Sequence, residues 1–409
     1  MIEIAGKINT AHCYVKSLDS RAAGQIRRMC DYPLTEGSKI RIMPDVHAGK
    51  GCTIGTTMTV HDKVCPNIVG VDIGCGMFVA KLSGAKPDLA RLDAAAHVIP
   101  SGMNVWNSPT EAFPLEELRC FGELKKRKWL ENSLGTLGGG NHFIELDRSS
   151  KGDYYLVIHS GSRNLGKQVA ELYQQCAVQL QKGILDLQQR KLEIIQTYRA
   201  EDRSDEIQTA LDALEKDYKS RTTHVPEDLC WLTGQPLEDY LHDVVLCQIF
   251  ARRNREIMAE ILLEAIGERA AETFHTIHNY IDTREMILRK GAIAAHEGEK
   301  VLIPLNMRDG SVLAIGKGNA EWNFSAPHGA GRVMSRTQAK QTLTMEEYRD
   351  SMRGIFTTSV TMDTLDEAPM VYKPMEEILG LIEDTVEVID VIKPVYNFKA
   401  PEGEPVRKK

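Results

Sequence analysis

The sequence predicts an α/β fold with mixed β-sheets at its centre and helices outside. Short apolar runs that end at glycine-flanked polar residues, such as 68–77 (IVGVDIGCGM) and 154–166 (YYLVIHSGSRNLG), are typical of strands that deliver loops to a sheet edge. Longer stretches repeat apolar residues every three or four positions, which indicates helices. With 409 residues, the chain can form a large core, and we expect a single domain over 1–409.

Composition narrows the class of protein. Apolar residues make up 42% of the chain, and no run approaches the roughly 18 apolar residues of a membrane span, so we expect no membrane partner. The start, MIEIAGKINTAH, lacks the basic and apolar segments of a secretory signal. Nine cysteines without a CxxC pair favour a reducing, cytoplasmic location over a disulfide framework.

The charge pattern argues against a wholly basic surface. The formal net charge is -7, so a polyanion would have to bind at a local patch. Clusters of this kind are more often solvated helix faces than binding sites. The candidate clusters are Lys125, Lys126, Arg127 and Lys128; Arg252, Arg253 and Arg255; and Arg332, Arg336 and Lys340.

The first motif in chain order is RIMPDVHAGKGCTIGTTMTV, over 41–60. Asp45, His47 and Lys50 lie among glycines ahead of a Thr-rich run that resembles a strand. The motif fits a loop next to a phosphate or a metal ion. It fits equally well a turn in which Asp45 and His47 cap backbone groups.

The second motif, IVGVDIGCGM, carries Asp72 and Cys75 on a glycine-rich loop. A carboxylate oxygen and a thiolate sulfur together suit a borderline divalent ion such as Mn, Fe, Co or Zn. The alternative is a tight turn after a buried strand, with Cys75 as a small core residue. The stretch alone does not choose between them.

The middle of the chain alternates helices with glycine-flanked histidines. We expect an amphipathic helical region over 85–135, then LGTLGGGNHFIEL with His142 and YYLVIHSGSRNLG with His159. The region 167–218 predicts a pair of long helices that project from the body, and 236–268 predicts another helix. The alternating run 274–282 predicts a strand that carries His278 and Asn279.

The last third contains FSAPHGAGRVMSRTQAK, in which His328 precedes a helix rich in Arg and Lys. A neutral imidazole can attack phosphorus, and glycines beside it let backbone N–H groups approach phosphate oxygens. A helix that begins just after His328 would add its positive end. A structural turn histidine is the alternative. Further on, we expect a helix near 374–390 and an exposed tail over 400–409.

Five ligand-type residues therefore stand at glycine-flanked strand ends. Each histidine alone is more often structural, but the set would suffice for two adjacent ions bridged by a thiolate, an arrangement that aligns a nucleophile and a leaving group. The five residues are Asp72, Cys75, His142, His159 and His278.

Six motifs, read together, resemble one known family. VGVDIGCGM, PDVHAGKG, LGTLGGGNHFIE, HSGSR, HNY and HGAGRVMSR occur in the order and spacing of the RtcB family of RNA ligases. The resemblance covers about 40–340 and the C-terminal VYNFK. It implies an RtcB-like fold with a helical hairpin insertion at about 167–235. It also implies GTP- and Mn-dependent joining of RNA 2′,3′-cyclic phosphate or 3′-phosphate ends to 5′-hydroxyl ends, in RNA splicing or repair.

The resemblance also implies roles for individual residues. Cys75 would bridge two Mn²⁺ ions, with Asp72 and His142 on the first ion and His159 and His278 on the second. His328 would become guanylylated, and Lys399 would contact guanine. Asp45, His47 and Arg163 would face the RNA ends. The residues expected to bind GTP or GMP are Asn141, His142, Phe143, Ile144, Glu145, Asn279, Met307, Ser311, His328, Gly329, Ala330, Gly331 and Lys399.

The chain departs from the family pattern in three places. It reads PLNMRDGS where many members read PGSMG, which puts nucleotide contacts from Leu305 and Asn306 in doubt while Met307 and Ser311 still align. Pro327 precedes His328 where several members have Ser, and ten residues follow Lys399. With the helical insertion, these departures suggest a divergent branch for RNA repair.

Two rival functions remain open from the sequence. One is a metal-dependent phosphodiesterase or phosphatase that acts on RNA ends without joining them. The other is a non-catalytic RNA-binding relative, for which an intact set of ligand residues would be unnecessary. As partners we expect RNA and GTP, with an activating protein as a further candidate and a monomer as the expected oligomeric state.

Overall fold

The computed structural model describes residues 1–84 and 86–400, and its first large sheet has six strands in the order β1-β2-β3-β4-β10-β9. The pairs are antiparallel except for β2 and β3, which run parallel. This sheet carries the 41–60 motif on β3 and β4. The bounds are β1 Ile2–Ala5, β2 Thr10–Cys13, β3 Ile40–His47, β4 Ile54–Thr59, β10 Ile287–Lys290 and β9 Asn279–Asp282.

The second large sheet has eight strands. Its order is β12-β13-β16-β6-β7-β5-β8, and β15 pairs in parallel with β16. A separate two-stranded sheet joins β11 and β14. The bounds are β5 Gly76–Leu82, β6 Phe143–Arg148, β7 Tyr154–Ser160, β8 Ala270–Ile277, β11 Ala292–Ala294, β12 Lys300–Asn306, β13 Gly310–Gly316, β14 Ser325–Pro327, β15 Phe356–Thr357 and β16 Val386–Lys399.

The eight-stranded sheet curls until its two edges meet. The backbone N–H of Leu302 on β12 donates to Oγ1 of Thr276 on β8 at 3.3 Å. One apolar cluster, which includes Met77, Phe143 and Leu313, fills the concave face of the curled sheet. Because side chains alternate along a strand, the other face of β6 packs into a separate core through Ile144 and Leu146.

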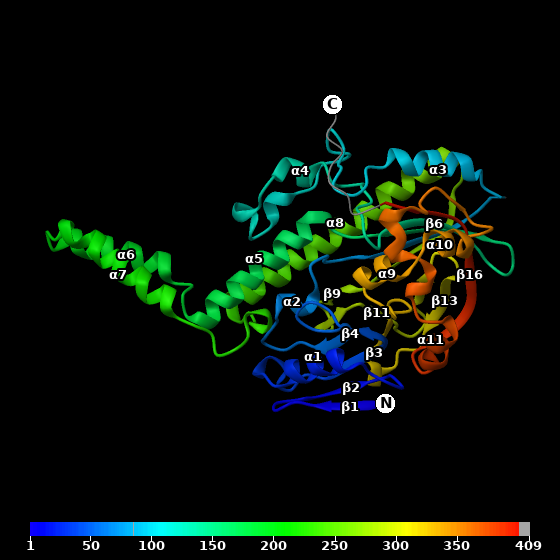
Figure 1. Ribbon diagram of the computed structural model, residues 1–409. Coiled ribbons are helices and arrows are strands. Elements are labelled where there is room, and N and C mark those ends of the chain that lie inside the picture. The colour runs from blue at the N-terminus through cyan, green and yellow to red at the C-terminus, as the bar shows by residue number, and fades with distance from the viewer. Residues whose placement is uncertain (85, 401–409) are drawn as a thin grey trace.

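Helices cover the outside of the sheets (Figure 1). The longest, α8 (Gly234–Ile266), packs against β5, β7, α3 and α5. It ends at Gly267, whose φ of 71° is in the left-handed region that glycine adopts without strain. No helix of the described ranges is long and apolar enough to cross a bilayer. The other bounds are α1 Ser20–Cys30, α2 Pro66–Val69, α3 Leu89–Val98, α4 Arg127–Glu131, α5 Arg163–Lys182, α9 Arg336–Thr342, α10 Met345–Ser351 and α11 Met375–Ile382.

A hairpin of two helices projects from the body, at the left of Figure 1. It consists of α6 (Leu187–Ala200) and α7 (Ile207–Ser220). The sequence predicts two helices over 167–218, but the region forms three, because α5 ends at Gly183 with φ 64°. Only α6 and α7 project, whereas α5 packs on α8.

The structure confirms the predicted α/β architecture and corrects several elements. Most of 85–135 is not helical: α3 and α4 are separated by turns and short 3-10 segments. The helix expected near 374–390 ends at Ile382, and the fourteen-residue strand β16 follows. Ala400, expected in the exposed tail, is buried, while the rest of that tail, 401–409, lies outside the described residues.

Candidate active site

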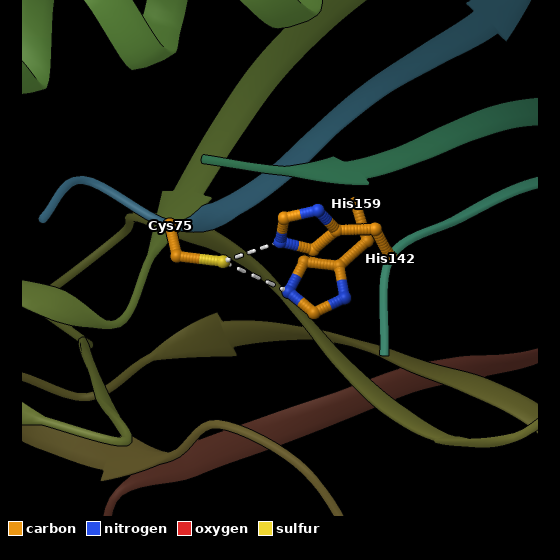
Figure 2. Close-up of side chains that lie close together, drawn as sticks. All are labelled: Cys75, His142 and His159. Carbon is orange, nitrogen blue, oxygen red and sulfur yellow. Dashed lines mark hydrogen bonds between the residues drawn. The ribbon is translucent and has the colours of Figure 1, made fainter. Parts of the chain in front are cut away.

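The centre of the site is a cluster of Cys75, His142 and His159 (Figure 2). Sγ of Cys75 lies 3.4 Å from Nε2 of His142 and 3.3 Å from Nε2 of His159. Cys75 and His142 directly precede β5 and β6, and β7 lies between these strands. The register places Met77 and Phe143 on either side of His159. The three side chains therefore lie at the same end of three neighbouring strands.

The other two predicted ligands extend this cluster. Oδ2 of Asp72 lies 3.1 Å from Nε2 of His142, and Nε2 of His278 lies 3.4 Å from Nε2 of His159. Oδ1 of Asp72 accepts a hydrogen bond from the backbone N–H of Ser162 at 3.0 Å. The structure thus brings together all five residues that the sequence singles out.

The histidines of the cluster are oriented by backbone carbonyls. Nδ1 of His142 is 2.8 Å from the oxygen of Leu137, and Nδ1 of His159 is 3.0 Å from the oxygen of Asn141. A carbonyl oxygen can only accept a hydrogen bond, so each Nδ1 must carry the hydrogen when its ring is neutral. Nε2 then presents a lone pair to the cluster. This is the tautomer that binds a metal ion.

Electrostatics in the cluster also suit metal ligation. Burial, followed by the neighbouring histidines, lowers the pKa of His159 and of His278, which keeps both rings neutral. Burial would raise the pKa of Asp72, but its contacts with His142, Cys75 and Arg163 together outweigh burial, and the pKa is lowered. Burial and Asp72 raise the pKa of the Cys75 thiol, so ion binding must release a proton. The donors fit borderline divalent ions.

His328 directly follows β14 and stands beside the cluster. Its ring lies 4.9 Å from that of His278, centroid to centroid. Oδ2 of Asp45 accepts from Nδ1 of His328 at 2.6 Å and from its backbone N–H at 3.1 Å. In the neutral ring, Nε2 therefore carries the lone pair.

The position of Asp45 differs from the expectation that this residue faces the RNA ends. Its side chain is fully buried, and the carboxylate holds His328, 283 residues away in the chain. The helix expected just after His328 begins only at Arg336. The residues that follow His328 directly are therefore not helical, and Gly331 among them has φ 74°.

A cavity of about 310 Å³ joins the cluster to His328. Both large sheets line it, and most residues predicted from the sequence belong to the lining. Leu305 and Asn306, whose contacts were in doubt, line it as well. The predicted residues in the lining are His47, Asp72, Cys75, Asn141, Phe143, Glu145, His159, His278, Asn279, Met307, His328, Gly329, Ala330, Gly331 and Lys399.

Five predicted residues are not part of the lining: His142 and Asp45, described above, and Ile144, Ser311 and Arg163. Ile144 points into the opposite core because it alternates with Phe143 and Glu145 along β6. Ser311 is buried on β13, opposite Ile392 of β16. Arg163 turns away: its guanidinium donates to Oγ1 of Thr136 at 2.9 Å and to the Gly102 oxygen at 2.6 Å.

The far end of the cavity is a charged cluster that sequence reasoning missed. Glu367 accepts from Nζ of Lys399 at 2.5 Å, from the hydroxyl of Tyr372 at 2.6 Å and from Arg332 at 3.2 Å. Arg336 pairs with the same carboxylate at 3.0 Å. Burial opposes ionisation, but Lys399 and Arg336 together lower the pKa of Glu367 to about 2. The only sequence signal was the Arg332, Arg336 and Lys340 cluster, interpreted there as a solvated face.

Glu145 lies at this end too and is almost fully buried. Its Oε1 accepts from Nδ2 of Asn397 on β16 at 2.6 Å. Burial raises the pKa of Glu145 to about 7, although Asn397 and Lys399 both act against the rise. The carboxyl group can therefore accept or donate a hydrogen bond near neutral pH, which suits the polar edge of a bound base.

Comparisons with known proteins identify the family of this chain. The family model described as tRNA-splicing ligase RtcB matches residues 25–116 and 116–400. An RNA-splicing ligase RtcB of Escherichia coli (strain K12) is 30% identical, covering 88% of this chain and 90% of that protein. A tRNA-splicing ligase RtcB of Aeropyrum pernix is 26% identical, covering 82% of each. An RNA-splicing ligase RtcB homolog 2 of Entamoeba dispar is 24% identical, covering 87% and 78%. With the family model matched over most of its length, the chain belongs to the RtcB family.

Proposed function

We propose that this chain is an RNA ligase that joins 2′,3′-cyclic phosphate or 3′-phosphate ends to 5′-hydroxyl ends, using GTP and Mn²⁺. Family membership supports the RNA ligase activity. One observation supports the chemistry above all others: an oriented imidazole, His328, shares a cavity with four of the five candidate metal ligands, and the fifth, His142, contacts two of those four. That combination suits nucleophilic attack on a phosphate whose charge must be neutralised.

The five ligands suit two divalent ions, with Cys75 between them. Asp72 contacts His142, His278 contacts His159, and the thiol of Cys75 contacts both His142 and His159. Mixed oxygen, nitrogen and sulfur donors of this kind accept Mn²⁺. When bound, the ions would offset the negative charge that develops on transferring phosphates.

In the first step, Nε2 of His328 attacks the α-phosphorus of GTP. A P–N bond forms, the bond to pyrophosphate breaks, and pyrophosphate leaves. The ring becomes positively charged as it reacts, and the Asp45 carboxylate on Nδ1 stabilises that charge. A side chain at Gly331 would clash with the backbone of Asp45, so glycine there lets the loop after His328 pack against β3.

In the next steps the guanylate leaves His328 for RNA. An oxygen of an RNA 3′-phosphate attacks the phosphorus, the P–N bond breaks, and a cyclic end must first be opened by water. The RNA 5′-hydroxyl then attacks the activated 3′-phosphate, and GMP leaves. His47, which lines the cavity, is the residue we place at the RNA ends.

The base would lie at the end of the cavity formed by Glu145, Lys399 and Glu367. Guanine presents N–H donors and a carbonyl acceptor on one edge. Glu145 offers an acceptor for the former, and Lys399 a donor for the latter. Lys399 is held ready by Glu367, which lowers the entropy lost when the base binds.

The decisive test is covalent labelling. We expect the protein, incubated with Mn²⁺ and GTP radiolabelled at the α-phosphate, to acquire an acid-labile label. His328→Ala abolishes the label, while His296→Ala, a change in a partly exposed histidine outside the cavity, retains it. A phosphodiesterase or phosphatase would process RNA ends without the label, and a non-catalytic relative would do neither. A stable label on His328→Ala protein would refute the assignment of the nucleophile.

A further inference from the structure

The middle of α8 contains two successive polar residues that are fully buried, Asn254 and Arg255. Arg255 is among the largest completely buried side chains of the described residues. Burying an amide and a guanidinium is unfavourable unless their hydrogen-bonding groups find partners. The partners of these two side chains therefore show what the protein gains from them.

Asn254 joins two loops that lead to the cluster. Its Oδ1 accepts from the backbone N–H groups of Gly135 and Thr136 at 2.7 and 2.9 Å. Its Nδ2 donates to the oxygens of Thr136 and Gly161, both at 3.1 Å. The first loop runs on to His142, and the second begins directly after His159. One side chain thus fixes the two loops relative to each other.

Arg255 links the loop that carries Cys75 to the end of β7, where His159 lies. Its Nη1 donates to the carbonyl oxygens of Gly74 and Ser160, each at 2.8 Å. These carbonyls belong to the residue before Cys75 and the residue after His159. Nε and Nη2 have no hydrogen-bond partner among the described residues, so the contacts that the side chain makes are to the backbone of the two ligand loops.

The loop that carries Cys75 also presses directly on α8. Gly74 has φ 77°, and a Cβ there would lie 3.0 Å from both Cβ of Ala251 and Cα of Gln248. The surface of α8 therefore limits how closely this loop can approach the helix, and the bond from Arg255 to the Gly74 carbonyl holds the loop there. The ends of β5 and β7 and the loop before β6 all rest on one rigid helix.

We propose that Asn254 and Arg255 are positioning residues that fix the spacing of Cys75, His142 and His159 and thereby the affinity and geometry of the metal centre. The inference rests on the metal centre of the proposed function. Protein ligands must sit within about 0.2 Å of their preferred distances to a metal ion. Partners behind the ligands commonly change metal affinity 10- to 100-fold, and here those partners act through the backbone.

The test compares variants of the full-length protein with a matched control on the same helix. Arg255→Met removes both donors at similar length, and Asn254→Asp keeps the acceptor but loses the donor. Arg255→Lys keeps a cation that reaches one carbonyl at most. It is the variant to measure if the other two fail to fold. The control is Phe250→Leu, which weakens a buried aromatic contact with Phe113 and leaves the three loops untouched.

The readouts are Co²⁺ affinity by titration, the absorption of the cobalt–thiolate bond, and the urea midpoint of the metal-free protein. We expect the three polar variants to bind Co²⁺ at least about 10-fold more weakly, with altered thiolate absorption. Phe250→Leu should lose stability but retain parental binding and spectrum. The proposal would be overturned if the polar variants kept the parental Co²⁺ affinity and spectrum. It would also be overturned if Phe250→Leu lost Co²⁺ affinity in proportion to its loss of stability. A parent protein that binds no Co²⁺ would instead refute the proposed metal centre itself.

Discussion

The bond between Asp45 and His328 offers the sharpest test of the proposed chemistry. Oδ2 of Asp45 accepts from both Nδ1 and the backbone N–H of His328, and the carboxylate is fully buried. In Asp45→Asn the amide oxygen can accept both bonds in the same geometry. The change therefore removes the negative charge and keeps both bonds, while an amide NH2 takes the place of Oδ1, which has no hydrogen-bond partner among the described residues.

The expected magnitude follows from the strength of the bond. A hydrogen bond to a charged group contributes about 1.5–3 kcal/mol and a neutral one about half as much. The charge matters most when His328 becomes positive during attack, so the barrier should rise by about 0.7–1.5 kcal/mol. At about 1.4 kcal/mol for each factor of ten, guanylylation should slow about 3- to 12-fold.

The assay is single-turnover labelling with α-phosphate-labelled GTP at saturating GTP and Mn²⁺. Asp93→Asn is the control, because Asp93 accepts side-chain hydrogen bonds from Thr358 and Tyr396 and does not line the cavity. The control should label at the parental rate. If Asp45→Asn labels as fast as the parent, the carboxylate does not stabilise the reacting ring and this account of step one is wrong.

Three further predictions concern the metal centre, the charged cluster and the hairpin. Cys75→Ser should weaken Mn²⁺ binding at least about 10-fold in equilibrium dialysis, whereas Cys176→Ser should not; two ions bound at parental affinity would exclude a bridging thiolate. The folded pKa of Glu367 is about 2, below its usual 4.5, so its stabilisation of about 3 kcal/mol is complete above pH 4.5 and is lost as the pH falls towards 2. Urea unfolding from pH 5 to 2 should show a shallower loss of stability in Glu367→Gln, and identical slopes would contradict the assignment. Replacing 187–220 by a short linker should shift the melting temperature by less than about 2 °C, because α6 buries no side chain and α7 buries only that of Tyr218; guanylylation should be unchanged, and its loss would assign the hairpin to the site.

The sequence alone singled out the candidate ligands and the candidate nucleophile. Asp72, Cys75 and His328 stood out beside glycines, because loops that present ligands need conformations that glycine allows, and the family resemblance supplied their expected roles. It also fixed the α/β architecture and the helix α8, since periodicity in apolar residues is a local signal. The sequence could also have predicted that Ile144 faces away from the cavity, because side chains alternate along a strand and Ile144 lies between Phe143 and Glu145.

Only the tertiary structure decided how these residues work together. Asp45 meets His328 across 283 residues of chain, and Arg255 reaches the Gly74 carbonyl across 181. Glu367 stands in a stretch without a motif and gains its role from Lys399, Tyr372 and Arg332. Such pairings depend on how two sheets and a helix pack, and local sequence patterns carry no information about which distant groups will share a buried, low-dielectric space.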